Sequence, residues 1–173
     1  MRIGLTYDLK DVYLARGFNF GRWTRSSNTF TTLSPSGSSP AGDEAASAMD
    51  TTRGRILFVG GLGADHHYYT LSSNSFTAPT FTGSSAGSAS GTGAAMVYVP
   101  AIDRYLLRQG GPGGTVFQIH PTTFDVSQFV TAGGSAIPAT QNGPYNKFLY
   151  VPRLGGVIYM PTYSGNAWFL RTN

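Results

Sequence analysis

The chain contains short runs of apolar residues that end at a turn or at glycine. "RILFVGG" (residues 55–61) is typical, with four apolar residues after Arg55 and then two glycines. A run of this length bounded by glycine predicts a β-strand, because a helix would need a longer segment. A strand with one face in water should alternate apolar and polar residues. This run does not alternate, so it predicts a strand covered on both faces.

The same pattern recurs along the chain with a period of about fifty residues. Four turns open the repeats, at Asp8, Asp50, Pro100 and Pro152. A second element, "SSNTF", returns as "SSNSF", and "PTTF" stands in the corresponding place of the third repeat. This alignment predicts equivalent positions for Phe30, Phe76 and Phe124.

Each of the first three repeats predicts four strands, and the last predicts three. The expected strands are 3–7, 11–16, 20–25 and 29–33; 45–50, 55–60, 67–72 and 75–81; 94–99, 104–109, 115–120 and 123–130; and 147–151, 156–160 and 166–171. Four-stranded units at this period are typical of a β-propeller, whose blades pack face to face. A β-sandwich would have no reason to repeat the turns in register. We therefore predict an all-β fold, a β-propeller or partial propeller.

The propeller is expected to form a single domain over residues 1–173. Its blades are expected at about 1–34, 45–82, 93–131 and 146–173.

The second and third repeats resemble the kelch repeat, in which an apolar strand ends in two glycines and an aromatic-rich strand follows. The matching residues are Gly60-Gly61 and Gly110-Gly111, then Tyr68-Tyr69 and Val116-Phe117, with Phe76 and Phe124 where tryptophan is usual. The other two repeats depart from the pattern, with a single Gly17 and with Met160-Pro161. The last repeat is similar to the final blade of galactose-oxidase-like propellers. The copper-radical site of galactose oxidase is not expected, because that site needs a cysteine and the chain has none.

The resemblance implies a ring of more than four blades. Four blades, the last one strand short, leave two blade faces and a strand edge uncovered, and such surfaces associate unless something covers them. Two alternatives remain open: the four blades close into a small propeller, or other protein chains or copies of this chain complete the ring. We favour the second, since no segment is left over to supply the missing strand.

Composition excludes several classes of function. Only 12% of the 173 residues are charged, and there is no cysteine, so a disulfide framework, a thiolate metal site and a cysteine nucleophile are excluded. The net charge of +4 is carried by scattered arginines, whereas nucleic-acid binding usually needs a clustered basic stripe. No apolar run approaches the ~18 residues of a membrane helix, and the N-terminus does not resemble a signal peptide. No helix is expected after the glycine-rich stretches, so no dinucleotide or phosphate-binding motif is predicted and no cofactor is expected.

The candidate binding surface is the rim that carries the long loops 34–46, 82–93 and 131–146. Long loops on a rigid scaffold often bind ligands, although glycine-serine composition equally suits flexible padding. The candidate residues are Phe18, Phe20, Asp65, His66, His67, Tyr68, Tyr163 and Asn166. Aromatic residues among them suit a carbohydrate platform, and packing between blades is the alternative for most of them.

"ADHHYY" (residues 64–69) is the stretch richest in chemically active side chains. Adjacent residues on a strand point to opposite faces, so His66 and His67 are not expected to share a metal ion. We predict neither a metal site nor a catalytic residue here.

These features favour a non-enzymatic structural or binding module of a larger assembly. A bacteriophage virion or tail component is the leading hypothesis, because a cysteine-free chain with uncovered edges and no signal peptide suits it. A secreted or cell-surface glycan-binding propeller is the first alternative. A metal-dependent enzyme centred on His66 and His67 is the second.

Overall fold

The computed structural model describes residues 4–7, 10–16, 19–39, 45–60, 66–110, 115–130, 140 and 143–172. These residues form four separate antiparallel sheets, here called blades 1 to 4. Blade 1 contains β1 (Gly4–Tyr7), β2 (Asp11–Arg16), β3 (Asn19–Thr24) and β4 (Thr29–Leu33). Blade 2 contains β5 (Ala46–Asp50), β6 (Arg55–Val59), β7 (His67–Thr70) and β8 (Ser75–Thr77). Blade 3 contains β9 (Ala95–Val99), β10 (Arg104–Arg108), β11 (Val116–Ile119) and β12 (Val126–Gln128). Blade 4 has three strands, β13 (Phe148–Val151), β14 (Gly156–Tyr159) and β15 (Trp168–Arg171).

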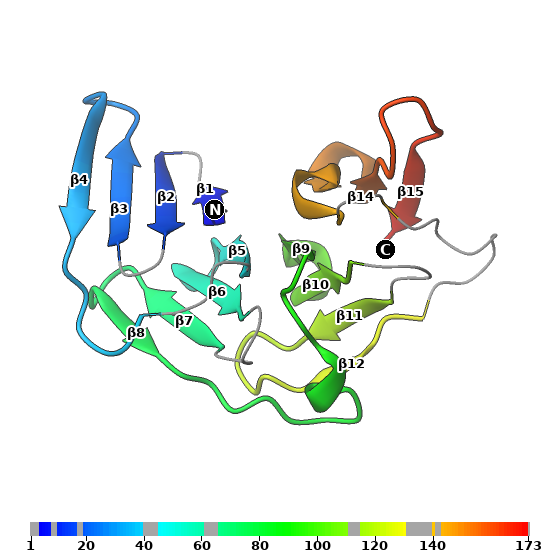
Figure 1. Ribbon diagram of the computed structural model, residues 1–173, viewed down its shortest axis with the longest axis horizontal. Helices are drawn as coiled ribbons and strands as arrows, with labels where there is room; N and C mark the ends of the chain where they lie inside the picture. The colour runs from blue at the N-terminus through cyan, green and yellow to red at the C-terminus, as the bar shows by residue number, and fades with distance from the viewer. Residues whose placement is uncertain are drawn as a thin grey trace.

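The blades are arranged radially along an arc that remains open between blade 1 and blade 4 (Figure 1). Each blade pairs its strands in chain order, and the first strands of successive blades are neighbours: β1 lies beside β5, β5 beside β9, and β9 beside β13. This arrangement confirms the predicted β-propeller architecture. Four short 3-10 turns complete the described elements: η1 (Ala86–Ser88), η2 (Pro100–Ile102), η3 (Tyr145–Lys147) and η4 (Pro152–Leu154).

The observed strands agree closely with the predicted ones except at the fourth strands. β8 ends at Thr77 instead of residue 81, and Pro79, which has no N–H to donate to a ladder, follows two residues later. β12 begins at Val126 instead of residue 123, because the preceding residues form the turn from β11.

The predicted equivalence of Phe124 with Phe30 and Phe76 is wrong by two residues. Phe124 has a φ of 55°, and the residues in the matching turns of blades 1 and 2 are Asn28 (52°) and Asn74 (48°). Val126 pairs with Ile119 as Phe76 pairs with Tyr69. The sequence comparison matched residue types, whereas the backbone repeats the left-handed turn position, and Val126 is the residue that corresponds to Phe76.

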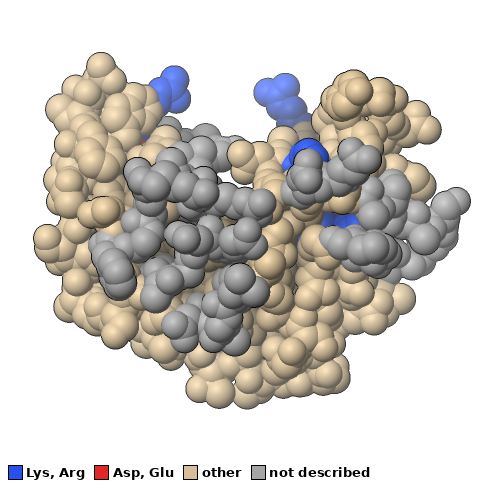
Figure 2. All heavy atoms as spheres, in the orientation of Figure 1, with Lys and Arg blue, Asp and Glu red and all other residues tan. Residues whose placement is uncertain are grey.

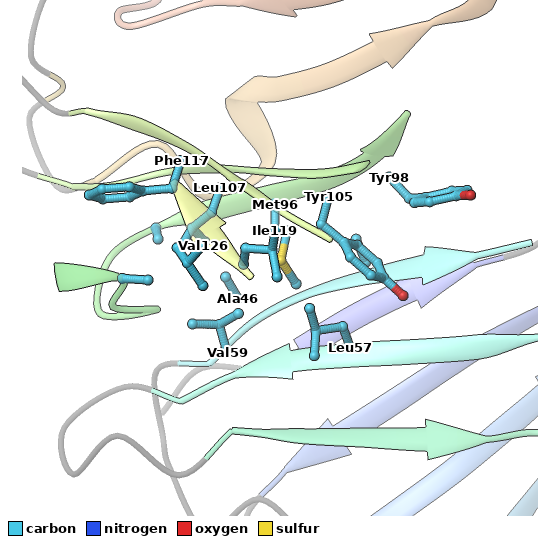
Figure 3. Close-up of a cluster of buried hydrophobic side chains, with 13 residues drawn as sticks. Ala46, Leu57, Val59, Met96, Tyr98, Tyr105, Leu107, Phe117, Ile119 and Val126 are labelled. Carbon is cyan, nitrogen blue, oxygen red and sulfur yellow. The ribbon is translucent and has the colours of Figure 1, made fainter. Parts of the chain in front are cut away.

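The core consists of apolar layers between adjacent blades. Figure 3 shows the layer between blades 2 and 3, where side chains from β5 and β6 meet side chains from β9 to β12. β6 contributes to two layers: Ile56 and Phe58 pack toward blade 1, and Leu57 and Val59 pack toward blade 3. All four are at most 1% exposed. The non-alternating run at residues 56–59 is therefore covered on both faces, as predicted.

An ion pair links the first turns of blades 2 and 3. Arg53 donates hydrogen bonds of 2.8 Å to each carboxylate oxygen of Asp103 and one of 2.9 Å to Asp50. Tyr98 donates a further bond of 2.6 Å to Asp103. The hydrogen bonds from Arg53, and then the one from Tyr98, hold the pKa of the Asp103 carboxyl well below its usual range.

In the part of the chain that the structure describes, no helix is long and apolar enough to span a membrane.

Candidate functional site

Two of the predicted binding residues lie in the layer between blades 1 and 2. Phe20 is 4% exposed, and its ring centre lies 4.6 Å from that of Tyr69 and 5.2 Å from that of Phe76. His67 is 7% exposed, and its ring meets Phe76 edge-on at 6.4 Å. Both side chains pack the blades together, which is the alternative role that the sequence left open for them.

His66 and Tyr68 belong to a stack of nearly parallel rings between blades 2 and 3. The order is His66, Phe81, Phe124 and Tyr68, with ring centres 4.0, 6.4 and 5.4 Å apart and interplanar angles of 11° to 13°. The Arg55 guanidinium lies 5.0 Å from the centre of the Tyr68 ring. Because the chain's own rings make these contacts, the stack fastens the segment that carries Phe81 to the two blades.

The two adjacent histidines occupy different surroundings. His66 accepts a 3.2 Å hydrogen bond on Nδ1 from the Gly60 N–H, whereas His67 lies in the layer facing blade 1. Within the described ranges, no three histidine, aspartate or glutamate side chains are grouped closely enough to hold a metal ion.

The remaining predicted residues are exposed or lie outside the described residues. Tyr163 and Asn166 lie between β14 and β15, and both are exposed, Tyr163 fully (102%). Phe18 and Asp65 lie outside the described residues. The structure therefore divides the described candidates among two packing layers and one exposed segment.

A different surface emerges at the free side of blade 1. Tyr13 and Phe20 face blade 2, so the side chains that alternate with them on β2 and β3 point the opposite way. We call this surface the open face of blade 1; it consists of Val12, Leu14, Trp23 and Phe30. Phe30 is 60% exposed and lies over Gly21, while Val12, Leu14 and Trp23 are half-buried.

Repeat positions show what this face lacks. Phe30 and Phe76 follow the same "SSN" turn, and each pairs with an aromatic residue of the third strand, Trp23 in blade 1 and Tyr69 in blade 2. Phe76 is only 5% exposed, because Phe20 of blade 1 covers it. Within the described residues no blade packs over Phe30, and its ring is 60% exposed.

Blade 4 has the complementary open face at the other end of the arc. Phe148, Val157 and Tyr159 pack against blade 3, and the alternating residues Leu149, Ile158 and Phe169 form the opposite face. Leu149 is 50% exposed and Phe169 47%, and Ile158 is half-buried. Figure 2 shows the surface hollowed between blade 1 and blade 4. At both ends of the described arc, large apolar side chains therefore remain exposed.

The repeat pattern predicts two uncovered faces but not the residues that form them. The repeated turn contained the signal. Phe30 follows the first "SSN" turn as Phe76 follows the second, so a phenylalanine at this position is expected to need cover from a neighbouring blade. Choosing the face also requires the strand register, because a shift of one residue moves every side chain to the opposite side.

Comparison with known proteins identifies the fold alone. No protein-family model matches the sequence, and no curated protein is significantly similar to it. Among solved structures, the chain is similar to YjhT (14% identity, TM-score 0.61), covering 97% of this chain and 64% of that one. It is also similar to a chain in a nidogen/laminin complex (15%, TM-score 0.62), covering 98% and 60%. A third neighbour is Kuenenia stuttgartiensis hydrazine synthase (9%, TM-score 0.60), covering 97% and 45%. This chain thus spans less than two thirds of the length of these three, and its fold is β-propeller-like.

Proposed function

We propose that the chain is a non-enzymatic structural or binding module whose two open faces dock blades supplied by other protein chains. The observation that carries the proposal is the contrast between Phe30 and Phe76, which are 60% and 5% exposed at equivalent positions. Rings of its own blade surround Phe76 on one side, and Phe20 of the neighbouring blade 1 packs on it from outside that blade. A blade is therefore the kind of surface that fits over Phe30.

Two further observations support docking of additional blades. Apolar faces of this kind are rare on isolated proteins and mark interaction surfaces when they do occur. Almost the whole chain aligns with 64% of YjhT and 60% of the nidogen/laminin chain, which leaves room in each of those chains for structure beyond four blades.

The sequence supports a more specific proposal for the type of repeat and for the kind of assembly. We propose a kelch-like repeat, because β6 ends immediately before Gly60 and Gly110 follows shortly after β10. A component of an extracellular assembly, such as a bacteriophage virion or tail, suits a chain with no cysteine and abundant glycine and serine.

The experiment measures the native mass of the chain, first for the purified chain alone and then for the chain mixed with the protein fraction from which it is isolated. We expect higher-mass species with the unmodified chain and their loss in Phe30→Ser/Phe169→Ser. Tyr163→Ser is the matched control, because it also removes an exposed aromatic ring but lies on neither open face. A stable monomer that gains no partner would contradict the proposal.

The exposure of Tyr163 favours one second candidate, glycan binding by the segment between β14 and β15. An exposed aromatic ring offers an apolar platform for a sugar, with a polar hydroxyl beside it. Glycan-array binding that Tyr163→Ala abolishes and Phe30→Ser leaves unchanged would support this candidate, and an empty array would remove it.

A further inference from the structure

The outer edges of blades 2 and 3 are each covered by a segment that arrives from the preceding blade. Ser36 lies parallel to β8: its N–H donates to the Asn74 carbonyl at 3.1 Å, and its carbonyl accepts from the Phe76 N–H at 2.8 Å. Thr82 repeats both bonds on blade 3, to the Phe124 carbonyl at 3.1 Å and from the Val126 N–H at 2.7 Å. The outer edges of blades 2 and 3 are therefore protected by a recurring parallel contact.

The two covering segments share a sequence, Ser/Thr-Gly-Ser-Ser, at residues 36–39 and 82–85. Two separate features of the backbone require the glycine of this sequence. Gly37 and Gly83 have φ angles of 82° and 93°, which side chains rarely adopt. A Cβ on Gly83 would lie 2.6 Å from the Val126 carbonyl oxygen, and one on Gly37 would collide with that of Phe76. Only glycine allows the segment to approach the edge strand so closely.

β4 presents the same receiving groups. The turn before it has a left-handed Asn28 where blade 2 has Asn74, and a 2.6 Å contact between the Ser27 and Thr29 hydroxyls matches the one between Ser73 and Ser75. In each turn the asparagine Oδ1 accepts a hydrogen bond from the aromatic residue of the third strand, from Trp23 at 3.2 Å and from Tyr69 at 2.8 Å. The turn and edge of blade 1 are thus built like those that bind the segment in blade 2.

No segment forms a bridge with the outer edge of β4 within the described residues, whereas one does so on both β8 and β12. β4 itself is exposed along most of its length. Both described Ser/Thr-Gly-Ser-Ser segments are already bonded to blades of their own chain, so a second copy does not offer one in the conformation seen here.

We propose that the outer edge of β4 is a docking site for an extended Ser/Thr-Gly-Ser-Ser segment supplied by a partner chain. The segment's Ser/Thr N–H donates to the Asn28 carbonyl, and its carbonyl accepts from the Phe30 N–H, which adds one parallel strand to blade 1. The inference rests on the proposed function, since the segment leads from a partner blade packed on the open face. It adds the chemistry of recognition: glycine next to a serine or threonine selects the partner.

The test is disulfide trapping, which a chain without cysteine makes unambiguous. The chain with Thr29→Cys is incubated with a peptide of residues 79–86 that has cysteine in place of Thr82. The buffer contains reduced and oxidised glutathione, and the oxidised form accepts the two electrons released when the disulfide forms. Thr29 occupies the position of Asp125, the bridge partner of Thr82. We expect trapping at least tenfold above that of the same peptide with Gly83→Ala. The intramolecular pair Thr82→Cys/Asp125→Cys calibrates the geometry.

Three results would overturn the proposal: equal trapping of both peptides, no trapping while the calibrating pair closes, or preferential dimers linked through residue 29, which would identify a second copy as the occupant. The test needs no partner blade, so it fails separately from the proposed function. Assembly without peptide trapping would leave the docking of blades in place and remove β4 as the site of the segment.

Discussion

At the scale of single residues, Asp103 adopts an unfavourable backbone conformation in its turn and in return forms an ion pair between two blades. Asp103 has a φ of 51°, and the corresponding turns of blades 2 and 4 have Gly54 and Gly155 there, both at 60°. Aspartate tolerates this region less readily than glycine. The Asp103 carboxylate compensates for this backbone cost by accepting hydrogen bonds from both terminal nitrogens of Arg53, a bidentate geometry that is stronger than a single hydrogen bond.

Arg53→Ala should lower the free energy of unfolding by at least about 1 kcal/mol. The pair with the partly exposed Asp103 accounts for a value of this size, and the fully buried Asp50 carboxylate also loses its charged partner. Urea titration at neutral pH measures this loss. Arg25→Ala, an exposed turn residue, is the control and should change the midpoint little.

The same ion pair predicts a pH dependence. The folded-state pKa of Asp103 is depressed, so its contribution to stability is complete above the ordinary aspartate pKa of about 3.9 and is lost as the pH falls below it. Arg53→Ala should therefore flatten the acid limb of a plot of stability against pH. An unchanged limb would show that Asp103 does not contribute to acid sensitivity.

At the scale of elements, comparing Gly83 with two glycines outside the covering segments shows what the covering segment of blade 3 requires of that position. Gly83 combines a positive φ with a carbonyl close to its missing Cβ, Gly54 has a positive φ in open space, and Gly87 has neither constraint. The three positions separate backbone strain from collision.

We expect Gly83→Ala to destabilise the chain most, by about 2–3 kcal/mol, and Gly54→Ala by about 1 kcal/mol. Gly87→Ala should be neutral or slightly stabilising, because alanine restricts the unfolded chain. Denaturant midpoints of the three variants provide the ranking. Equal losses at Gly83 and Gly54 would mean that the edge contact adds nothing to the strain.

Equivalent phenylalanines give a second comparison between elements. Phe76→Ala should cost about 3–5 kcal/mol, the range for a buried ring, whereas Phe30→Ala should cost less than about 1 kcal/mol in the chain alone. Denaturant unfolding of both variants measures the difference. Similar losses would indicate that the open face of blade 1 is covered in the isolated chain.

At the scale of the whole molecule, the number of covered faces differs from blade to blade. In the part of the chain that the structure describes, blades 2 and 3 are packed on both faces, whereas blades 1 and 4 each pack against one neighbour. Local opening is easiest where few buried contacts hold an element. Stability should therefore decrease from the middle of the arc toward its ends.

Native-state hydrogen exchange should show this gradient. Amides of β6 and β10 are expected to exchange most slowly, and those of β2 and β14, which are equivalent strands with one open face, faster by at least tenfold. A docked partner should reduce the difference. Uniform protection in the isolated chain would argue that both ends are already covered.

The sequence by itself determined the strands and their grouping. Strand length, glycine and turn residues are local signals, so "RILFV" predicted both the strand at 55–59 and its cover on two sides. Repetition predicted the number of blades and the missing last strand for the same reason, because each blade is built from one local unit.

Only the tertiary structure decided which residues face a neighbour. Phe124 is the same residue type as Phe76, yet it occupies the left-handed turn position. The register of β11 with β12 shows that Val126 is the residue equivalent to Phe76. The candidate site shows the same limit. The sequence allows His67 and Phe20 to be ligand contacts, but the packing of blade 1 on blade 2 buries both. The sequence equally allows Phe30 to be a core residue, but no blade in the described residues covers it. Burial depends on contacts between segments distant in the chain, and the local pattern does not contain them.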